Sequence, residues 1–535
     1  MAGQIIDQIR EHINNRNNFL LSGGAGSGKT YTLMQVLDII REKDPIANIA
    51  CITYTNVAAD EIKARSPYQK LRVSTIHDFL WDVIKTYQQN LKIVLCELIS
   101  EYSEDNKAGI KFEGESASNI DYFANKTIEY KDYRKLEEGV VWHDDILKIA
   151  HRMFEKYPLL CNIVKDKYPY ILVDEYQDTD KLVIDILLAF LQRDNKKTNI
   201  IGFFGDSMQS IYDDKGIGDI QLYIDNGLVK EVKKEDNYRC SEKVIGLINQ
   251  IRTDGITQNA VANNKIGTIT FLYSDKVDFS ISNLKAESDI FKNWDFTNPK
   301  ETKELYLTHK LIAKEYGFTA LLSFYNKADR LLGDETNRDR LANHLLKIQE
   351  LISLYERRKF NDVIKKISIK IRKLSDKKFL QEKIEELKLT ARTIEELITI
   401  ADTNALIRID DKLTEFIQED SERYDKIKLL DRTQVEKVYN YIEGYSPYST
   451  QHGIKGAEFE NVFVVLDNGN WSKYNFKYLF ENTLGKETII NRTQKLFYVS
   501  CSRAKNNLVV FFHKPSASVI TQAKVWFGEE NVREV

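Results

Sequence analysis

A glycine-rich segment near the N-terminus constrains this chain more than any other feature. An apolar stretch over residues 19–21 runs into Gly23-Gly24-Ala25-Gly26-Ser27-Gly28-Lys29-Thr30, which has the GxxxxGK[ST] spacing of a P-loop. Glycines let backbone N–H groups curl around a triphosphate, and a helix that begins near Gly28 adds its positive dipole end. Lys29 would reach the β- and γ-phosphates, and Thr30 would bind Mg²⁺. The segment therefore predicts a site for ATP and Mg²⁺, to which we assign Gly23, Gly24, Ala25, Gly26, Ser27, Gly28, Lys29, Thr30 and Tyr31.

The composition is that of an ordinary globular protein with several domains. The chain has 535 residues, of which 42% are hydrophobic and 29% charged, and this length suggests about three or four domain-sized units. Its five cysteines have no paired spacing, which argues against a zinc site or disulfide framework and is typical of a reducing cytoplasm. No apolar run approaches the length that crosses a membrane, so we expect a cytoplasmic protein without a membrane partner. Because the net charge is −3, a nucleic-acid site would have to be a local basic groove.

Two further apolar runs predict strands that end in polar side chains near the P-loop. Residues 170–173 lead into Asp174 and Glu175. An acid at the end of a buried parallel strand can hold Mg²⁺, so we assign that role to Asp174, with Glu175 orienting or deprotonating the attacking water. The alternative is a pair of surface acids after a core strand. Residues 200–204 form the second run, and after it Gln209 is our candidate for sensing the γ-phosphate.

In their order along the chain, these segments resemble the motifs of superfamily 1 helicases of the UvrD/Rep/PcrA group. The resemblance covers nearly the whole chain and implies an α/β fold with two RecA-like P-loop motor domains, helical accessory insertions, and ATP bound between the motor domains. It also implies translocation on single-stranded DNA, with 3′→5′ polarity as the family expectation. Besides the P-loop, the matching segments are residues 51–62, 74–79, 174–179, 205–212, 237–241, 450–459 and 498–505.

The resemblance assigns further residues to the nucleotide. Arg239 and Arg503 fall at the family's arginine-finger positions, where cations neutralise charge on the γ-phosphate and are worth about 10³ to 10⁵ in rate. Their alternative is the ordinary surface arginine. Tyr238 would stack on adenine, and Glu458 would bind the ribose or couple it to DNA contacts.

The family places an adenine-reading glutamine before the P-loop. Gln8 stands at that position, and Gln4 is a rival. An amphipathic helix with Ile6, Ile9 and Ile13 on one face is the alternative explanation of the same segment.

For DNA, the resemblance implies contacts from several of the motifs. Thr55 and Asn56 would contact phosphate, and Tyr54 would offer a stacking face. The complete set of DNA-contacting candidates is Thr53, Tyr54, Thr55, Asn56, Thr75, His77, Tyr212, Thr450 and His452.

The chain departs from the family after Tyr212. Relatives usually carry an aromatic residue and an arginine there, whereas this chain has Asp213-Asp214-Lys215-Gly216. Stacking of an aromatic side chain is worth about 1–3 kcal/mol per base, and Asp214 cannot stack and would repel phosphate. We therefore predict a weaker grip on single strands than in the relatives, which Asp214→Trp would strengthen in a binding titration.

The motif positions predict two motor domains, each with an insertion. Residues 1–85 and 141–225 would form the first domain, with 86–140 as a small helical accessory insertion. Residues 226–325 and 436–535 would form the second, which would carry both arginine fingers and strands at 267–272 and 305–310. Residues 326–435 contain no proline and are predicted to be helical, with apolar residues at Ile364, Ile367, Ile371 and Leu374. The basic span 357–378 is either a surface for duplex DNA or a partner, or a solvated helix face.

Three functions are compatible with these patterns. The first is an ATP-dependent DNA helicase or translocase acting on single-stranded or tailed duplex DNA. The second is a motor subunit with little unwinding of its own that serves a separate nuclease, as helicases of this type do in DNA repair and in antiphage pairs such as Gabija. The third is an ATP-gated clamp on DNA that does not translocate.

Overall fold

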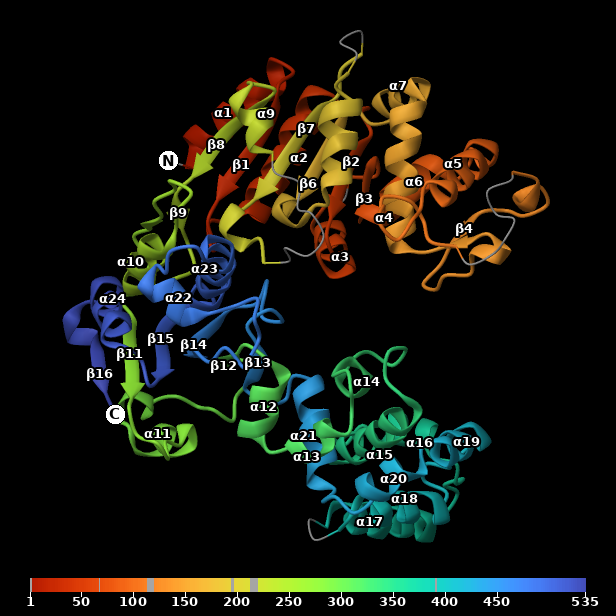
Figure 1. The fold of residues 1–535 in the computed structure, drawn as a ribbon, viewed down its shortest axis with the longest axis vertical. Helices are drawn as coiled ribbons and strands as arrows, with labels where there is room; N and C mark the ends of the chain where they lie inside the picture. Colours follow the sequence, from red (N-terminus) through yellow and green to blue (C-terminus); the bar gives the residue numbers. More distant parts are fainter. Residues whose placement is uncertain (1, 67, 113–119, 194–196, 212–219, 390–391) are drawn as a thin grey trace. The chain divides into compact units, whose positions relative to one another are not determined.

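The computed structural model describes residues 2–66, 68–112, 120–193, 197–211, 220–389 and 392–535, which form two compact units (Figure 1). The first unit contains residues 1–266 and 494–502, and the second contains residues 267–493 and 503–535. Each unit is built around its own parallel sheet, as the predicted α/β fold with two RecA-like motor domains requires.

The sheet of the first unit has six parallel strands in the order β3-β2-β6-β7-β1-β8. Because all strands are parallel, their carboxyl ends lie at one edge, which is where α/β sheets bind ligands. The strands are β1 (Asn18–Gly23), β2 (Ile49–Thr53), β3 (Leu71–Thr75), β6 (Tyr170–Asp174), β7 (Ile200–Gly205) and β8 (Val229–Lys234).

Both faces of this sheet are buried. Phe19 and Leu21 of β1 join a core with α1 and α2, whereas Leu20 joins a second core with α4 and α6 on the opposite face. This double burial explains why the central strands β1, β2, β6 and β7 are largely apolar. The helices are α1 (Ala2–Asn14), α2 (Lys29–Lys43), α3 (Asn56–Arg65), α4 (Ile76–Ile84), α5 (Gln88–Ser100), α6 (His143–Lys156), α7 (Pro158–Lys167), α8 (Lys181–Ile184), α9 (Gln221–Asp225) and α10 (Glu242–Ile251).

The predicted small helical insertion at 86–140 is only partly helical. It contains α5 and a short parallel pair of strands, β4 (Glu129–Tyr130) and β5 (Val140–Val141). Its apolar side chains, such as Leu95 and Phe123, continue the core that covers the α4 face of the sheet.

The sheet of the second unit also has six parallel strands, in the order β13-β12-β14-β15-β11-β16. Phe463 and Phe511 point into a core shared with the helical insertion, while Phe271 packs on Phe480 and Phe527. The strands are β11 (Thr268–Ser274), β12 (Thr302–Tyr306), β13 (Tyr448–Thr450), β14 (Phe459–Val465), β15 (Ala504–His513) and β16 (Val532–Glu534), and the flanking helices are α11 (Ile281–Glu287), α12 (His309–Tyr316), α22 (Phe476–Glu481) and α24 (Ala517–Phe527). Helix α23 (Glu487–Cys501) begins in the second unit, but its residues from 494 onward belong to the first.

A run of helices separates β12 from β13, so the predicted helical insertion is confirmed as helical. Its apolar periodicity does not mark one continuous helix, however, because Ile367 has extended backbone angles and ends α16. The helices are α13 (Thr319–Ser323), α14 (Asp329–Leu332), α15 (Arg340–Glu356), α16 (Phe360–Lys366), α17 (Leu374–Lys388), α18 (Ile394–Thr403), α19 (Asp411–Glu419), α20 (Ser421–Ile427) and α21 (Thr433–Ile442).

Two predicted boundaries differ from the structure. The predicted start of the second domain at residue 226 is too early, because β8 pairs with β1 along six residues and residues 226–266 therefore belong to the first unit. The predicted strand at 305–310 is too long at its end. Thr308 is the N-cap of α12 and accepts a hydrogen bond from the Leu311 amide, so the chain is already helical at His309.

Candidate nucleotide site and nucleic-acid surface

The P-loop connects β1 to α2, as predicted, and its glycines are required by close neighbours. Gly26 and Gly28 have φ angles of 77° and 75°, in the left-handed region that side chains disfavour. A Cβ atom on Gly26 would lie 2.6 Å from Cβ of Arg239 and 2.7 Å from Oδ1 of Asn237. A Cβ atom on Gly24 would overlap the side-chain amide of Gln258, with its closest atom at 2.3 Å. Asn237, Arg239 and Gln258 therefore form one wall of the loop.

Lys29 is held inside the loop that it follows. Its Nζ donates hydrogen bonds to the carbonyl oxygens of Gly23 and Gly24, at 3.0 Å and 3.2 Å. Burial lowers the pKa of Lys29, while the charges of three nearby carboxylates, led by Asp206, favour its protonated form. The negative charge of a bound triphosphate would therefore stabilise the protonated form of Lys29.

The acidic pair lies at the carboxyl end of β6, with Asp174 as the last residue of the strand and Glu175 directly after it. Burial and the neighbouring charge of Glu175 raise the pKa of Asp174 to about 7. Glu175 has a φ angle of 52°, an uncommon backbone conformation for a side chain of this type, and its carboxylate accepts a hydrogen bond from Gln177. Strained residues of this kind concentrate at functional sites, because the surrounding structure must hold them. A hydroxyl from Thr30 and a carboxylate from Asp174 are oxygen ligands of the type that Mg²⁺ prefers alongside substrate phosphates.

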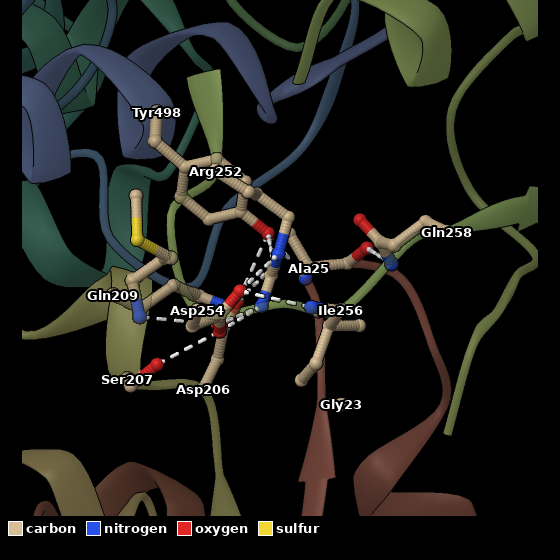
Figure 2. A network of polar contacts seen from close by, with 12 residues as sticks. Gly23, Ala25, Asp206, Ser207, Gln209, Arg252, Asp254, Ile256, Gln258 and Tyr498 are labelled. Atoms are coloured by element: carbon tan, nitrogen blue, oxygen red, sulfur yellow. Dashed lines mark hydrogen bonds and ion pairs between the residues drawn. The ribbon is translucent and has the colours of Figure 1, made fainter. Parts of the chain in front are cut away.

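A buried ion pair anchors the end of β7 beside the P-loop (Figure 2). The Arg252 guanidinium lies 3.0 Å from the Asp206 carboxylate, and both side chains are at most 1% exposed. Although burial opposes its ionisation, the charges of Arg252 and Lys29 hold the pKa of Asp206 below its usual range. Gln209, the candidate sensor, donates to the same carboxylate at 2.8 Å.

Tyr498 joins this pair to the P-loop. Its hydroxyl donates to Asp206 at 3.0 Å and accepts from the Ala25 amide, also at 3.0 Å (Figure 2). Burial, with the neighbouring Asp206 charge, raises the pKa of Tyr498, so its proton is available for that donation. One buried chain of hydrogen bonds thus connects Gln209 with the P-loop backbone and with α23.

Residues 237–239 contact the P-loop directly. The Tyr238 amide donates to the Gly26 carbonyl at 2.9 Å, and the side-chain amides of Asn237 and Gln258 donate to the Ala25 carbonyl, each at 3.0 Å. The phenol ring of Tyr238 remains half exposed beside them, as a stacking surface for a base would be. The predicted place of Arg239 in the second motor domain is wrong, because the residue lies in the first unit, next to the P-loop.

The two glutamine candidates lie exposed on α1, whose apolar face is buried through Ile9 and Ile13. The amphipathic helix is therefore confirmed, and the adenine-reading role of Gln8 or Gln4 stays a prediction. Tyr31 is also exposed, at the start of α2.

The carboxyl ends of β2 and β3 present two helix N-termini side by side. Thr53 pairs in register with Thr75. Thr55 caps α3 by accepting from the Ala58 amide at 3.2 Å, and Thr75 caps α4 by accepting from the Asp78 amide at 3.2 Å. Helix N-termini attract anions such as DNA phosphates. This β2–β3 edge, as we call it, therefore carries most of the predicted DNA contacts.

Other predicted DNA contacts vary in exposure. Tyr54 and Asn56 are exposed on this edge, whereas Thr53 is buried and donates to the Thr55 carbonyl at 3.0 Å. His77 packs edge-on against His143, with ring centroids 4.9 Å apart. Tyr212 and residues 213–216, including Asp214, lie outside the described residues.

The remaining site candidates belong to the second unit. Arg503 is buried and donates to the Ala457 carbonyl at 3.3 Å, and Glu458 forms an exposed ion pair with Lys505 at 3.2 Å. At the end of β13, Thr450 accepts from the Gly453 amide and His452 shares a hydrogen bond of 2.7 Å with the Tyr474 hydroxyl. Trp471 packs against the His452 ring, with centroids 5.4 Å apart.

Sequence reasoning missed Arg252 and Gln258. Neither lies in a recognisable motif. Only the fold brings Arg252 to Asp206 and Gln258 to the Ala25 carbonyl. Among the residues that the structure describes, no helix is long and apolar enough to cross a membrane.

The fold and this site define a P-loop nucleotide hydrolase with two RecA-like sheets. A family model described as an AAA domain matches residues 7–215. The chain is 28% identical to the Gabija protein GajB of Bacillus cereus, over 98% of this chain and 97% of that protein. It is 25% identical to the ATP-dependent DNA helicase PcrA of Staphylococcus epidermidis, over 64% of this chain and 50% of that protein, and 24% identical to a probable DNA helicase II homolog of Mycoplasma capricolum, over 83% of this chain and 67% of that protein. These similarities support an ATP-hydrolysing DNA helicase of the superfamily 1 UvrD/Rep/PcrA type.

Proposed function

We propose that this protein uses ATP hydrolysis to move along single-stranded DNA in the 3′→5′ direction. The observation that carries the proposal is the layout of one sheet edge in the first unit. There β6 lies between β7 and β2, so the nucleotide residues at the ends of β1, β6 and β7 adjoin the exposed helix N-termini at the β2–β3 edge. A change at the phosphates can therefore be transmitted to DNA contacts within one rigid sheet.

The hydrolysis step uses the residues around the P-loop. Bound Mg²⁺, held by Thr30 and Asp174, would neutralise charge on the β- and γ-phosphates. Glu175 accepts a proton from water as the water oxygen bonds to the γ-phosphorus and the bond to the bridging oxygen of ADP breaks. Lys29 and Arg239 stabilise the negative charge on the transferred group. Arg503 is proposed as the second arginine finger.

The Asp206 network gives a route from chemistry to movement. Gln209 and Tyr498 share the Asp206 carboxylate, and Tyr498 also holds the Ala25 amide. Loss of the γ-phosphate would alter the Gln209 contact, and the buried hydrogen bonds would pass that change to α23. Because these groups are packed and desolvated, a small shift at one end requires rearrangement of the others.

Displacement of streptavidin from biotinylated oligonucleotides tests direction and movement together. The proposal expects ATP-dependent release from the 5′ end and none from the 3′ end, with Glu175→Gln inactive at both. Release from the 3′ end only would contradict the polarity. Strong ATP hydrolysis without release from either end would contradict movement and favour the ATP-gated clamp.

A second candidate function is a motor subunit that serves a nuclease in antiphage defence. The near full-length similarity to the Gabija protein GajB favours it. Strand displacement on tailed duplexes, measured alone and with a co-purified nuclease, separates the two. Unwinding only in the presence of the nuclease would support the subunit function, and equal unwinding without it would support an independent helicase.

A further inference from the structure

A second lysine lies beneath the P-loop helix. Lys234 is the last residue of β8, where it pairs in register with Gly23 at the start of the loop. Its Nζ donates to the Thr32 hydroxyl at 2.6 Å and to the Gly28 carbonyl at 3.3 Å. The residue is only 4% exposed. Lys234 thus reaches the first turn of α2 from the neighbouring strand.

The contacts of this ammonium group differ from those of Lys29. Both hydrogen-bond acceptors of Lys234 are neutral, and among the described residues no carboxylate lies within ion-pair distance of it. It also lies at the N-terminus of α2, where the helix dipole is positive and disfavours a cation. A buried cation in such a position gains more than an exposed one when an anion binds nearby.

Three charged or titratable groups face Lys234 from the surrounding elements. Burial, against the opposing charge of Asp236 on β9 (Asp236–Asn237) and with the charge of Lys29 on α2, lowers the pKa of Lys234 to about 8. The Asp236 carboxylate itself accepts from the Tyr238 hydroxyl at 3.1 Å, and the Tyr238 ring lies 5.7 Å from the Lys234 Nζ. Lys234 is therefore part of the same corner as the proposed adenine-stacking residue.

We propose that Lys234 is a positioning residue of the nucleotide site, which fixes the turn at Gly28 and supplies a second positive charge that bound phosphates stabilise. Nucleotide binding is then linked to proton uptake. A lysine that is partly deprotonated in the free protein must take up a proton as the phosphates arrive, so affinity falls as the pH rises above about 8. The inference rests on nucleotide binding at the P-loop and does not depend on DNA translocation.

Titration calorimetry of the full chain with ADP tests this directly. The measurement is made at pH 8 in EDTA, in two buffers with different ionisation enthalpies, so that metal binding contributes nothing. The wild type is expected to take up a substantial fraction of a proton. Lys234→Arg keeps a permanent charge and is expected to bind ADP without that uptake, while Lys29 contributes equally to both proteins.

Two further variants complete the test. Lys234→Met is expected to bind roughly tenfold more weakly at pH 7, and Lys233→Met, an exposed neighbour on β8, should match the wild type in affinity and proton uptake. Equal proton uptake in the wild type and Lys234→Arg would overturn the proposal even if Lys234→Met fails to fold. Absence of any ADP binding by the wild type would overturn both this proposal and the nucleotide site.

Discussion

We call the residues around the P-loop at the ends of β1, β6 and β7 the nucleotide corner. The nucleotide corner and the β2–β3 edge lie on the same sheet, yet they are built differently. At the corner, Lys29, Asp174, Asp206 and Arg252 are charged groups in low-exposure surroundings, each with a defined partner. At the β2–β3 edge, Tyr54, Thr55 and Asn56 are uncharged and exposed. Thr55 and Thr75 there accept hydrogen bonds from backbone amides in the first turns of their own helices.

The difference fits the role that we propose for each region. Phosphoryl transfer requires several charges to be fixed before the substrate arrives, because reorganisation during the reaction would raise the barrier. A grip on single-stranded DNA must be released at every step, so small contacts from exposed groups are sufficient. Substitutions should therefore have large, specific effects at the corner and small, additive effects at the edge.

The largest effect is expected for Glu175→Gln. This change keeps the shape of the side chain but removes the base, and general bases contribute roughly 10²- to 10⁴-fold in rate. Steady-state ATP hydrolysis should fall by that factor while nucleotide affinity is kept. Glu231→Gln, on the exposed face of β8, is the control, and a Glu175→Gln rate within threefold of it would remove Glu175 from the mechanism.

Arg252→Met should have the next largest effect, on stability. It leaves the Asp206 carboxylate buried without its guanidinium, and breaking a buried pair by removing one partner costs about 3–5 kcal/mol. Urea unfolding checks this against Arg41→Met, whose exposed guanidinium lies 3.8 Å from Asp38. An equal loss of unfolding free energy in the two variants would show that the buried Arg252–Asp206 pair is no more important for stability than an exposed pair.

Asp174→Asn should raise stability in a pH-dependent way. Since the pKa of Asp174 is raised to about 7 in the folded state, its contribution to stability is full at low pH and is lost as the pH rises through about 7. In metal-free buffer the variant should be roughly 1–3 kcal/mol more stable than the wild type at pH 8, with a smaller difference at pH 5. A difference independent of pH would contradict the assignment.

The smallest effects belong to the β2–β3 edge. Thr55→Ala removes an N-cap and should cost about 1 kcal/mol of stability and a few-fold in affinity for oligo(dT), measured by fluorescence anisotropy. Thr393→Ala, which removes the cap of α18, should cost similar stability without changing affinity. A tenfold or greater loss of oligo(dT) affinity in Thr55→Ala would contradict the expectation that single contacts at this edge have small effects.

The sequence predicted the local fold around the P-loop, because that motif permits few alternatives, whereas the roles of its residues stay predictions. The P-loop spacing required β1 and α2, and the apolar runs before Asp174 and Gln209 required two buried parallel strands. The local pattern could not reveal Arg252 or Gln258, since their roles arise from contacts with residues more than forty positions away in the sequence, such as Asp206 and Ala25.

Domain boundaries were less predictable for a related reason. Residues 229–234 could form a strand of either motor domain, and only the pairing of β8 with β1 assigns them to the first sheet. Likewise, the apolar periodicity continues through Ile367, where α16 ends although the sequence has no proline or glycine there. In both cases tertiary packing decides what the local sequence leaves open.

The most direct test of the central claim is ATP hydrolysis with and without single-stranded DNA, in the wild type and Lys29→Ala. Lys43→Ala, at the opposite end of the same helix α2, serves as the matched control. A DNA-coupled motor predicts strong stimulation by DNA in the wild type and the control, and loss of hydrolysis in Lys29→Ala. A hydrolysis rate that is unchanged by DNA, or that is retained in Lys29→Ala, would contradict the coupling of the nucleotide corner to the β2–β3 edge.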